Sequence, residues 1–224
     1  AIAADRIAAG SARTVVAGGT ESMSLVPMGG HKIAPNPTLV SEYPDVYLST
    51  GLVAENHARE SSISRQAQDE FALKSHQRAV NAIEKGFFKN EIVPLTVRMV
   101  QSNGGKPAVK EFAFDTDEGP RRDTSIEALT KLKPAFHVSG TVTAGNSSQT
   151  SDGAAAVIVT SQELAKERGL TPLARFVGYA TAGVAPELFG IGPVPGIRKV
   201  LKQTGLSLNQ LDLIEVNEPF AASA

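Results

Sequence analysis

The 224-residue sequence contains no cysteine, which excludes disulfide bonds and thiolate metal sites within it. Lys+Arg 22 against Asp+Glu 23 gives a formal net charge of −1, so there is no basic field to attract nucleic acid or an anionic membrane surface. No apolar run reaches the length of a membrane span. No His, Asp and Glu residues show the spacing of a metal site, and no G-x-G-x-x-G or G-x-x-x-x-G-K motif is present to cradle a nucleotide phosphate.

The composition is typical of a soluble globular protein. Hydrophobic residues make up 42% and charged residues 20%, in a chain long enough for one large domain or two small ones. There is no initiator methionine, and residues 1–10 already read as a helix closed by a glycine. The sequence stops at Ala224, inside an alanine-rich stretch that is typical of a helix start. We therefore expect a fragment of a longer protein.

Apolar periodicity, together with punctuation by glycine, proline and serine, predicts alternating helices and strands. Serine N-caps are expected at Ser64, Ser125 (or Thr124) and Ser161. Strands 13–17 and 154–159 are expected to be buried, the second on both sides because it has no polar face. The expected helices cover residues 1–9, 51–58, 65–85, 126–132, 162–168 and 195–203. The expected strands cover residues 13–17, 91–97, 110–114, 154–159, 175–180 and 211–216.

The middle of the sequence differs from its two ends. Residues 25–50 contain four prolines and a glycine pair, and are expected to be mostly loop. Residues 102–105, Ser-Asn-Gly-Gly, predict a turn that joins strands 91–97 and 110–114 into a hairpin. The alternation of helices and buried strands at both ends indicates a layered α/β fold, with a large insertion at about residues 25–140.

Three motifs follow one another along the chain: AGGTESMS at residues 17–24, TAGNSSQTSDGAAA at 143–156 and NEPF at 217–220. In this order they resemble thiolases, and the resemblance covers essentially the whole chain. It implies part of the thiolase fold, layered α/β/α/β/α. Residues 1–24 would end the N-terminal half. Residues 25–140 would form a loop domain over coenzyme A (CoA), returning in part to the N-terminal half near its end, and residues 141–224 would begin the C-terminal half.

The resemblance further implies an acyltransferase that cleaves 3-oxoacyl-CoA with CoA into acyl-CoA and acetyl-CoA, or runs the reverse Claisen condensation. CoA would be a substrate, with no cofactor and no metal. The sequence NSSQ at residues 146–149 favours the thiolases of fatty-acid β-oxidation over acetoacetyl-CoA-specific acetyl-CoA acetyltransferases. A homodimer or homotetramer in a bacterial cytoplasm or an organelle matrix is implied. A non-catalytic, thiolase-like CoA-binding protein is the alternative.

The family nucleophile is a cysteine at a strand-to-helix turn, where the helix dipole and backbone N–H groups stabilise the thiolate. A histidine and a second cysteine complete the chemistry. The resemblance places the first cysteine just before Ala1 and the other two residues beyond Ala224. Because an acyl transfer of this kind needs an activated nucleophile and a base, we expect the 224-residue chain to be inactive by itself.

Asn217 is the candidate catalytic residue. By resemblance, it holds a water that, with a histidine, donates to the thioester or enolate oxygen, and fixed donors of this kind stabilise developing charge. The alternative is a plain helix N-cap, with Pro219 in the first turn. Pro219 replaces the usual alanine of the family motif, and we expect it to reshape the pocket without abolishing function.

The remaining candidates are CoA-binding residues. Ser148 matches the serine that binds the pantetheine amide, and Ala144 is small enough for the pantetheine arm to pass close to the backbone. Arg121 would contact the adenine and 3′-phosphate. Phe136 would lie beside the pantetheine tunnel, and Met28 near the acyl end.

Each CoA-binding candidate has a simpler alternative. Ser148 can be a turn residue before a strand, and Arg121 can be a solvated surface charge balanced by nearby acids. Phe136 and Met28 can be ordinary core residues. The four histidines, His31, His57, His76 and His137, do not cluster, and we interpret all four as surface or supporting residues.

Overall fold

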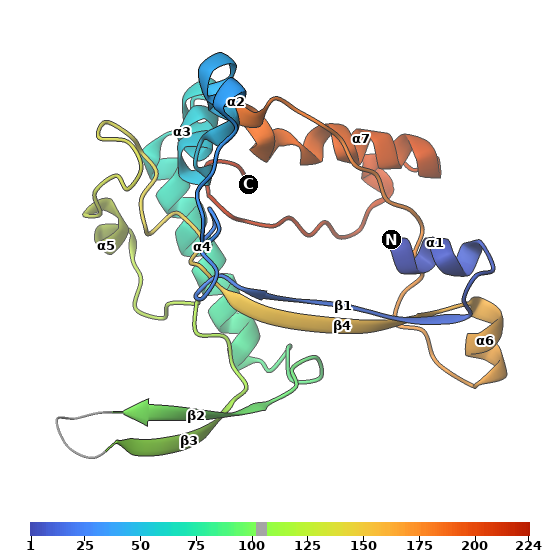
Figure 1. Ribbon diagram of the computed structural model, residues 1–224. Helices are drawn as coiled ribbons and strands as arrows, with labels where there is room; N and C mark the ends of the chain where they lie inside the picture. Colours follow the sequence, from blue (N-terminus) through green and yellow to red (C-terminus); the bar gives the residue numbers. More distant parts are fainter. Residues whose placement is uncertain (102–106) are drawn as a thin grey trace.

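A long antiparallel ribbon runs through the molecule (Figure 1). The computed structural model describes residues 1–101 and 107–224. In it, β1 (Thr14–Ser22) pairs with β4 (Asp152–Thr160), so that the first motif lies beside the end of the second. The register places Val16 opposite Ile158, and α1 (Ile2–Ala8) contacts both strands. The ribbon therefore joins the two ends of the sequence across the insertion.

A second strand pair projects away from the helices (Figure 1). β2 (Leu95–Gln101) and β3 (Ala108–Phe114) are antiparallel, and Arg98 forms a salt bridge of 2.9 Å with Glu111 across them. The expected strand pair is thereby confirmed, but the first strand, expected at residues 91–97, begins at Leu95 and extends to Gln101. The turn expected at 102–105 lies outside the described residues.

Serine N-caps begin the helices where the sequence predicts them. The hydroxyls of Ser64, Ser125 and Ser161 each accept a backbone N–H from three residues later, at 3.1 or 3.2 Å. The last long helix ends at Gly205, whose φ of +70° is a left-handed conformation that favours glycine. The helices are α3 (Thr50–Glu60), α4 (Arg65–Glu84), α5 (Ile126–Thr130), α6 (Gln162–Glu167) and α7 (Pro193–Thr204).

The proline-rich segment 25–50 is mostly loop, as expected, but it also contains short helical turns. Asn36 caps α2 (Pro37–Glu42), which is followed by η1 (Pro44–Tyr47). Both begin with a proline, which is compatible with a first helical turn because the missing N–H has no partner there. Two further 3-10 helices, η2 (Pro186–Ile191) and η3 (Leu208–Gln210), lie in the C-terminal third.

Two expected strands do not form. Residues 175–180 and 211–216 are irregular, and in the described part of the chain neither segment belongs to a β-ladder. A strand is stable only when its backbone N–H and C=O groups pair with a neighbour. The apolar composition of these segments is a local preference, whereas pairing requires a second strand beside them.

The expected burial of the ribbon is also wrong. Val16 and Ile158 are each 72% exposed. Among the described residues the sheet has only two strands, and α1 reaches them only near one end. An apolar strand is buried only where other layers cover both of its faces, so composition alone could not establish burial here.

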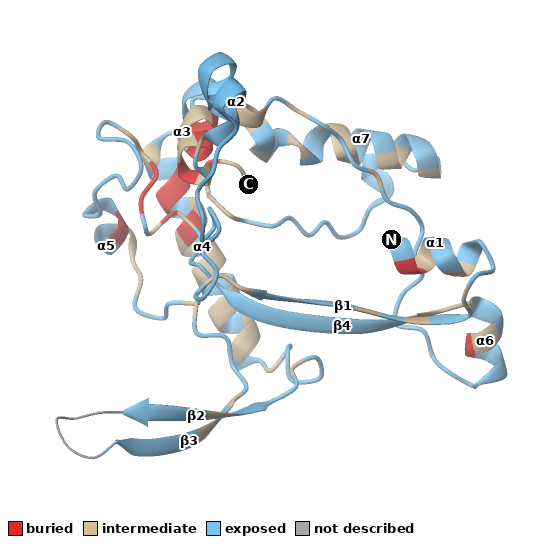
Figure 2. Ribbon diagram, viewed as in Figure 1, coloured by how far each residue is buried: buried red, intermediate tan, exposed pale blue. Residues whose placement is uncertain are grey.

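The buried core lies elsewhere, where α3 meets two loop segments (Figure 2). Ala54 and Ala58 of α3 pack against Val142 and Ala222, with Phe220 against the group. This core fixes residues 141–146 and 220–222 next to each other. No helix in the described ranges is long and apolar enough to span a membrane.

Candidate functional site

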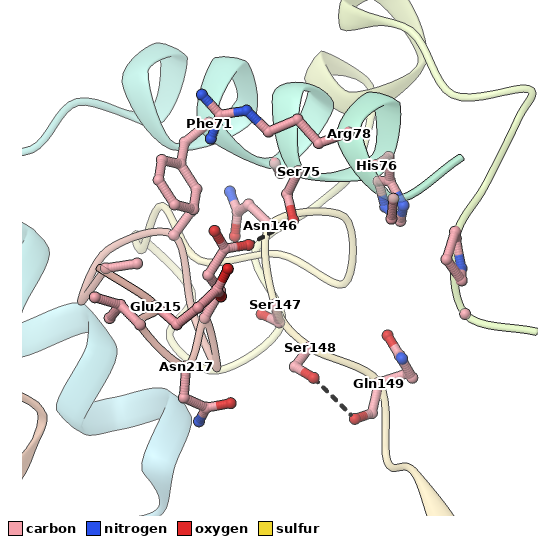
Figure 3. Close-up of a pocket in the computed structure, with 18 of the residues that line it drawn as sticks. Phe71, Ser75, His76, Arg78, Asn146, Ser147, Ser148, Gln149, Glu215 and Asn217 are labelled. Carbon is pink, nitrogen blue, oxygen red and sulfur yellow. Dashed lines mark hydrogen bonds between the residues drawn. The ribbon is translucent and has the colours of Figure 1, made fainter. Parts of the chain in front are cut away.

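An open cavity of about 930 Å³ lies beside this core, along one face of α4 (Figure 3). Four segments that are distant in sequence form its walls. They are residues 71–82 of α4, Gly119 and Pro120, residues 145–149, and residues 214–218, with Phe88, Ala221 and Ala224 at the edges.

Ser148 and Asn217, the two candidates nearest the expected chemistry, both line this cavity. Their segments are joined by a backbone hydrogen bond of 2.8 Å from the Ser148 N–H to the Pro219 carbonyl, and by an isolated β-bridge between Ser147 and Phe220. The Ser148 hydroxyl donates to the Gln149 carbonyl at 3.1 Å. A short two-segment pairing thus brings the second and third motifs to one wall.

In the described chain Asn217 does not cap a helix, and its role as a site residue stays a prediction. Residues 217–224 contain no helix in the described structure; instead, the Ser223 N–H donates to the Phe220 carbonyl at 3.0 Å and closes a turn. Asn217 is exposed at the cavity. Its amide is therefore available to a ligand or a water there.

Glu218, the residue after Asn217, is tied to the opposite wall. Ser75 of α4 donates its hydroxyl to the Glu218 carboxylate at 2.5 Å (Figure 3). The contact joins the helix wall of the cavity to the loop that carries Asn217. Sequence reasoning missed it, because a serine in mid-helix and a glutamate in a motif give no signal that they meet.

His76 also lines the cavity, and it contacts the turn that carries Arg121. Its Nδ1 accepts the Arg121 backbone N–H at 3.1 Å, so the neutral ring carries its proton on Nε2. Burial, and secondarily the charge of Arg121, lowers the pKa of His76, against an opposing effect of Asp123. His76 thus helps to hold the Gly119–Arg121 turn at the rim, and the neutral form makes that contact.

The other candidates lie outside the cavity wall. Arg121 itself is exposed, directly after the lining residues Gly119 and Pro120. Ala144 is exposed and adjoins the lining residue Gly145. Met28 is 70% exposed in the loop after β1, so the core alternative for it is wrong.

Phe136 packs against the core from outside. Its ring meets Phe220 edge to face, with centroids 5.9 Å apart, and lies over Gly51 of α3, where a Cβ would come within 2.1 Å of the ring. The ring remains 40% exposed and is not among the cavity-lining residues. Phe136 therefore supports the Phe220 side of the wall.

The surface interpretation of His57 is wrong. This side chain is 3% exposed, because α3 packs against η2 and the ring lies against Gly190. A Cβ at Gly190 would lie 2.6 Å from the His57 Nε2, and burial lowers the pKa of the ring. The helical periodicity of the sequence did not mark position 57 as buried, because a histidine is not counted as an apolar residue in that pattern.

The chemistry available at the cavity is hydrogen bonding. Asn217, Ser148 and His76 offer donors, and the carboxylates of Glu215 and Glu218 offer acceptors. Across the described ranges, no three His, Cys, Asp or Glu side chains come together as metal ligands would. The arrangement can orient a polar ligand and stabilise an oxyanion, whereas a covalent step needs a nucleophile from elsewhere.

Comparison with known proteins identifies relatives along the whole chain. The family models described as "Thiolase, N-terminal domain" and "Thiolase, C-terminal domain" match residues 1–163 and 170–224. A 3-ketoacyl-CoA thiolase of Bacillus subtilis is 49% identical over 100% of this chain and 58% of its own length. An acetyl-CoA acetyltransferase of Escherichia coli is 44% identical, over 99% of this chain and 58% of its own length.

Solved structures give the same picture at the level of the fold. The crystal structure described as the dimeric peroxisomal thiolase of Saccharomyces cerevisiae superimposes with a TM-score of 0.86 at 36% identity, over 98% of this chain and 55% of that one. The fold is thus the corresponding part of a thiolase fold. The chain spans 58% of the length of the curated relatives quoted above.

Proposed function

The chain belongs to the thiolase family, and from that premise we propose that the complete protein transfers acyl groups to and from CoA. The reaction is thiolytic cleavage of a 3-oxoacyl-CoA by CoA to a shortened acyl-CoA and acetyl-CoA. The observation that carries this proposal is that Ser148 and Asn217 line the same cavity, of about 930 Å³.

The roles of the cavity residues follow from charge development. When a thiolate attacks the 3-oxo carbon, the carbonyl oxygen gains charge; breaking the bond between carbons 2 and 3 then releases an acetyl-CoA enolate that must be protonated. The Asn217 amide, acting through a water, would stabilise an oxyanion. Ser148 would bind the pantetheine amide, and Arg121 the adenine and 3′-phosphate. Ser148 and Arg121 would contact parts of CoA that are remote from the reacting carbons, so they would contribute mainly to binding.

The covalent step needs groups that this sequence does not contain. With no cysteine among the 224 residues, the nucleophile that forms the acyl-enzyme and the acid or base that protonates the enolate would come from other parts of the complete polypeptide. A second CoA, as a thiolate, would then attack the acyl-enzyme and release the shortened acyl-CoA.

For the substrate class we propose 3-oxoacyl-CoA of fatty-acid β-oxidation, with acetoacetyl-CoA as the shortest member. This choice is supported by the sequence NSSQ at residues 146–149 and by the 49% identical relative named 3-ketoacyl-CoA thiolase. The relatives named acetyl-CoA acetyltransferase, 44% identical in Escherichia coli, support the second candidate, an acetoacetyl-CoA-specific enzyme.

We also propose that the complete protein is a homodimer or homotetramer in a bacterial cytoplasm or an organelle matrix. A solved relative is described as dimeric, and curated relatives include bacterial and peroxisomal thiolases. Light scattering after size-exclusion chromatography of the complete gene product measures the assembly state directly.

The function is tested by assaying the complete gene product with CoA and a series of 3-oxoacyl-CoA substrates of increasing chain length. Cleavage of both acetoacetyl-CoA and a long-chain substrate is expected. Activity confined to acetoacetyl-CoA would favour the acetyltransferase. CoA binding without turnover would favour the non-catalytic alternative. The absence of both CoA binding and turnover would refute the proposal.

A further inference from the structure

A buried carboxylate stands behind the cavity wall and does not face the cavity itself. Asp69 of α4 is 0% exposed, and its Oδ1 accepts a hydrogen bond of 2.9 Å from the Asn146 amide. Its Oδ2 accepts the Arg65 Nε–H at 2.8 Å, as one half of a salt bridge. A buried charge is unfavourable without such partners. Breaking the hydrogen bond between Asp69 and Asn146 is therefore energetically costly.

Asn146 is the point where the cavity segments meet. Its Oδ1 accepts the Thr143 N–H at 2.7 Å, and its backbone carbonyl accepts the Ala221 N–H at 3.0 Å. The first bond shapes the loop that leads to Ser148; the second joins this loop to the segment that follows Asn217. Figure 3 shows Asn146 beneath α4, with Ser147 and Ser148 on the continuing chain. One 3%-exposed residue therefore binds α4 and the 141–146 loop through its side chain, and the segment after Asn217 through its backbone carbonyl.

A second, half-buried contact holds the start of the same loop. The carboxylate of Glu55, on α3, accepts the N–H groups of Thr141 and Val142 at 2.9 to 3.0 Å. Gly140 leaves room for it, since a Cβ there would lie 2.0 Å from the Glu55 Oε1. The loop is thus bound to α3 at one end and to α4 in its middle, and Asn146 is the nearer of the two anchors to the cavity.

We propose that Asp69, acting through Asn146, is a positioning residue that sets the relative placement of Ser148 and Asn217. The inference rests on the proposed function for what these two residues do, but the linkage itself rests on the contacts above. Positioning matters because reacting groups must be held close to their productive geometry, and a displacement of about 1 Å costs about a hundredfold in rate. Neither Asp69 nor the Asn146 amide contacts the substrate in this scheme.

The test exchanges the two side chains. Asn146→Asp places a carboxylate against Asp69, and Asp69→Asn turns an amide N–H towards Arg65 or Asn146. In the double variant, the amide at position 69 donates to the carboxylate at position 146 and still accepts from Arg65, while position 146 still accepts the Thr143 N–H. The bond to the Thr141 carbonyl, 3.2 Å, is lost, and the salt bridge to Arg65 becomes a hydrogen bond to a neutral amide oxygen.

The variants are made in the complete gene product and compared with Ser161→Ala. The control removes the side-chain N-cap of α6, away from the cavity. Asn146→Asp is expected to lower kcat on the order of one hundredfold and to raise the Kd for CoA, with the double variant recovering about tenfold of each loss. Ser161→Ala is expected to lower only the melting temperature.

The outcomes separate this inference from the proposed function. If the wild type cleaves 3-oxoacyl-CoA but Asn146→Asp changes only the melting temperature, like the control, the contact is merely structural and the inference is wrong. The inference is equally wrong if the double variant is no better than the worse single variant. A wild type that neither binds CoA nor cleaves substrate would overturn the proposed function, and this inference with it.

Discussion

Asn217 faces the cavity on a segment with no regular secondary structure, so its position depends on the contacts of its neighbours. Ser75 holds Glu218 from α4, and the Pro219 carbonyl is bound by the Ser148 backbone. The position of Asn217, which the NEPF motif marks, thus depends on Ser75 and Ser148, which lie outside that motif. Two substitutions separate its role from that of the rim.

Asn217→Ala in the complete gene product is expected to lower kcat by roughly a hundred- to a thousandfold, or less because the donor acts through a water. The KM for CoA should change little, because the amide acts on developing charge and not on the pantetheine arm. Steady-state kinetics measure both. A normal kcat with a reduced melting temperature would mean that Asn217 has only a structural role.

Arg121→Ala is expected to give the opposite pattern, a raised KM for CoA with kcat near normal. The guanidinium lies on the turn after Gly119 and Pro120, at the cavity rim, where it can bind a phosphate but not a reacting carbon. Arg122→Ala is the matched control, since Arg122 is paired with Glu84 on α4. Equal effects of both variants would indicate general surface charge.

At the scale of elements, two helices carry the histidines whose pKa values are lowered. Burial lowers the pKa of His57 on α3, against an opposing effect of Glu60. Burial and then the charge of Arg121 lower the pKa of His76 on α4. The imidazole ring on each helix is therefore more easily protonated in the unfolded chain than in the folded one. In the unfolded chain its pKa returns to about 6.5.

This difference predicts a loss of stability in acid. As the pH falls through about 6.5, the unfolded chain takes up protons that the folded chain resists, so the free energy of unfolding falls until the pH reaches the folded pKa values. Urea unfolding of the complete gene product from about pH 8 to about pH 5 measures the slope. His57→Leu combined with His76→Gln should reduce it, whereas His31→Gln, in the exposed proline-rich loop, should not.

Elements with local signals were predictable, whereas two expected strands failed for want of a neighbouring strand. Ser64 and Gly205 mark helix boundaries through bonds and backbone angles within a few residues. Residues 175–180 and 211–216 have strand composition but, among the described residues, no ladder partner. A periodicity of apolar residues says which face could be buried, and only a neighbouring layer decides whether it is.

At the scale of the whole molecule, the two-stranded ribbon leaves large apolar side chains in solvent. Val16 and Ile158 lie opposite each other and are each 72% exposed. Exposed apolar strands with unpaired edges are sites of aggregation. In the 224-residue chain, this surface is not covered by any other described element.

We therefore expect the 224-residue chain, expressed alone, to be inactive in thiolysis and poorly soluble or molten. Val16→Thr with Ile158→Thr should increase its solubility, because the two substitutions make one face of the ribbon more polar. Sedimentation and near-ultraviolet circular dichroism are the measurements. A cooperative melt with a full near-ultraviolet signal would contradict the expectation, and turnover above background would overturn the assignment of the nucleophile to a cysteine elsewhere.

The sequence by itself determined the family, through three motifs at residues 17–24, 143–156 and 217–220, and the positions of most helices, through caps and periodicity. It also predicted Ser148 and Asn217 as site residues. Only the tertiary structure decided that these two share a wall and that Asp69 and Glu55 hold it. The physical reason is range: caps and turns depend on bonds within a few residues, whereas burial and polar pairing depend on which distant segments the chain brings together.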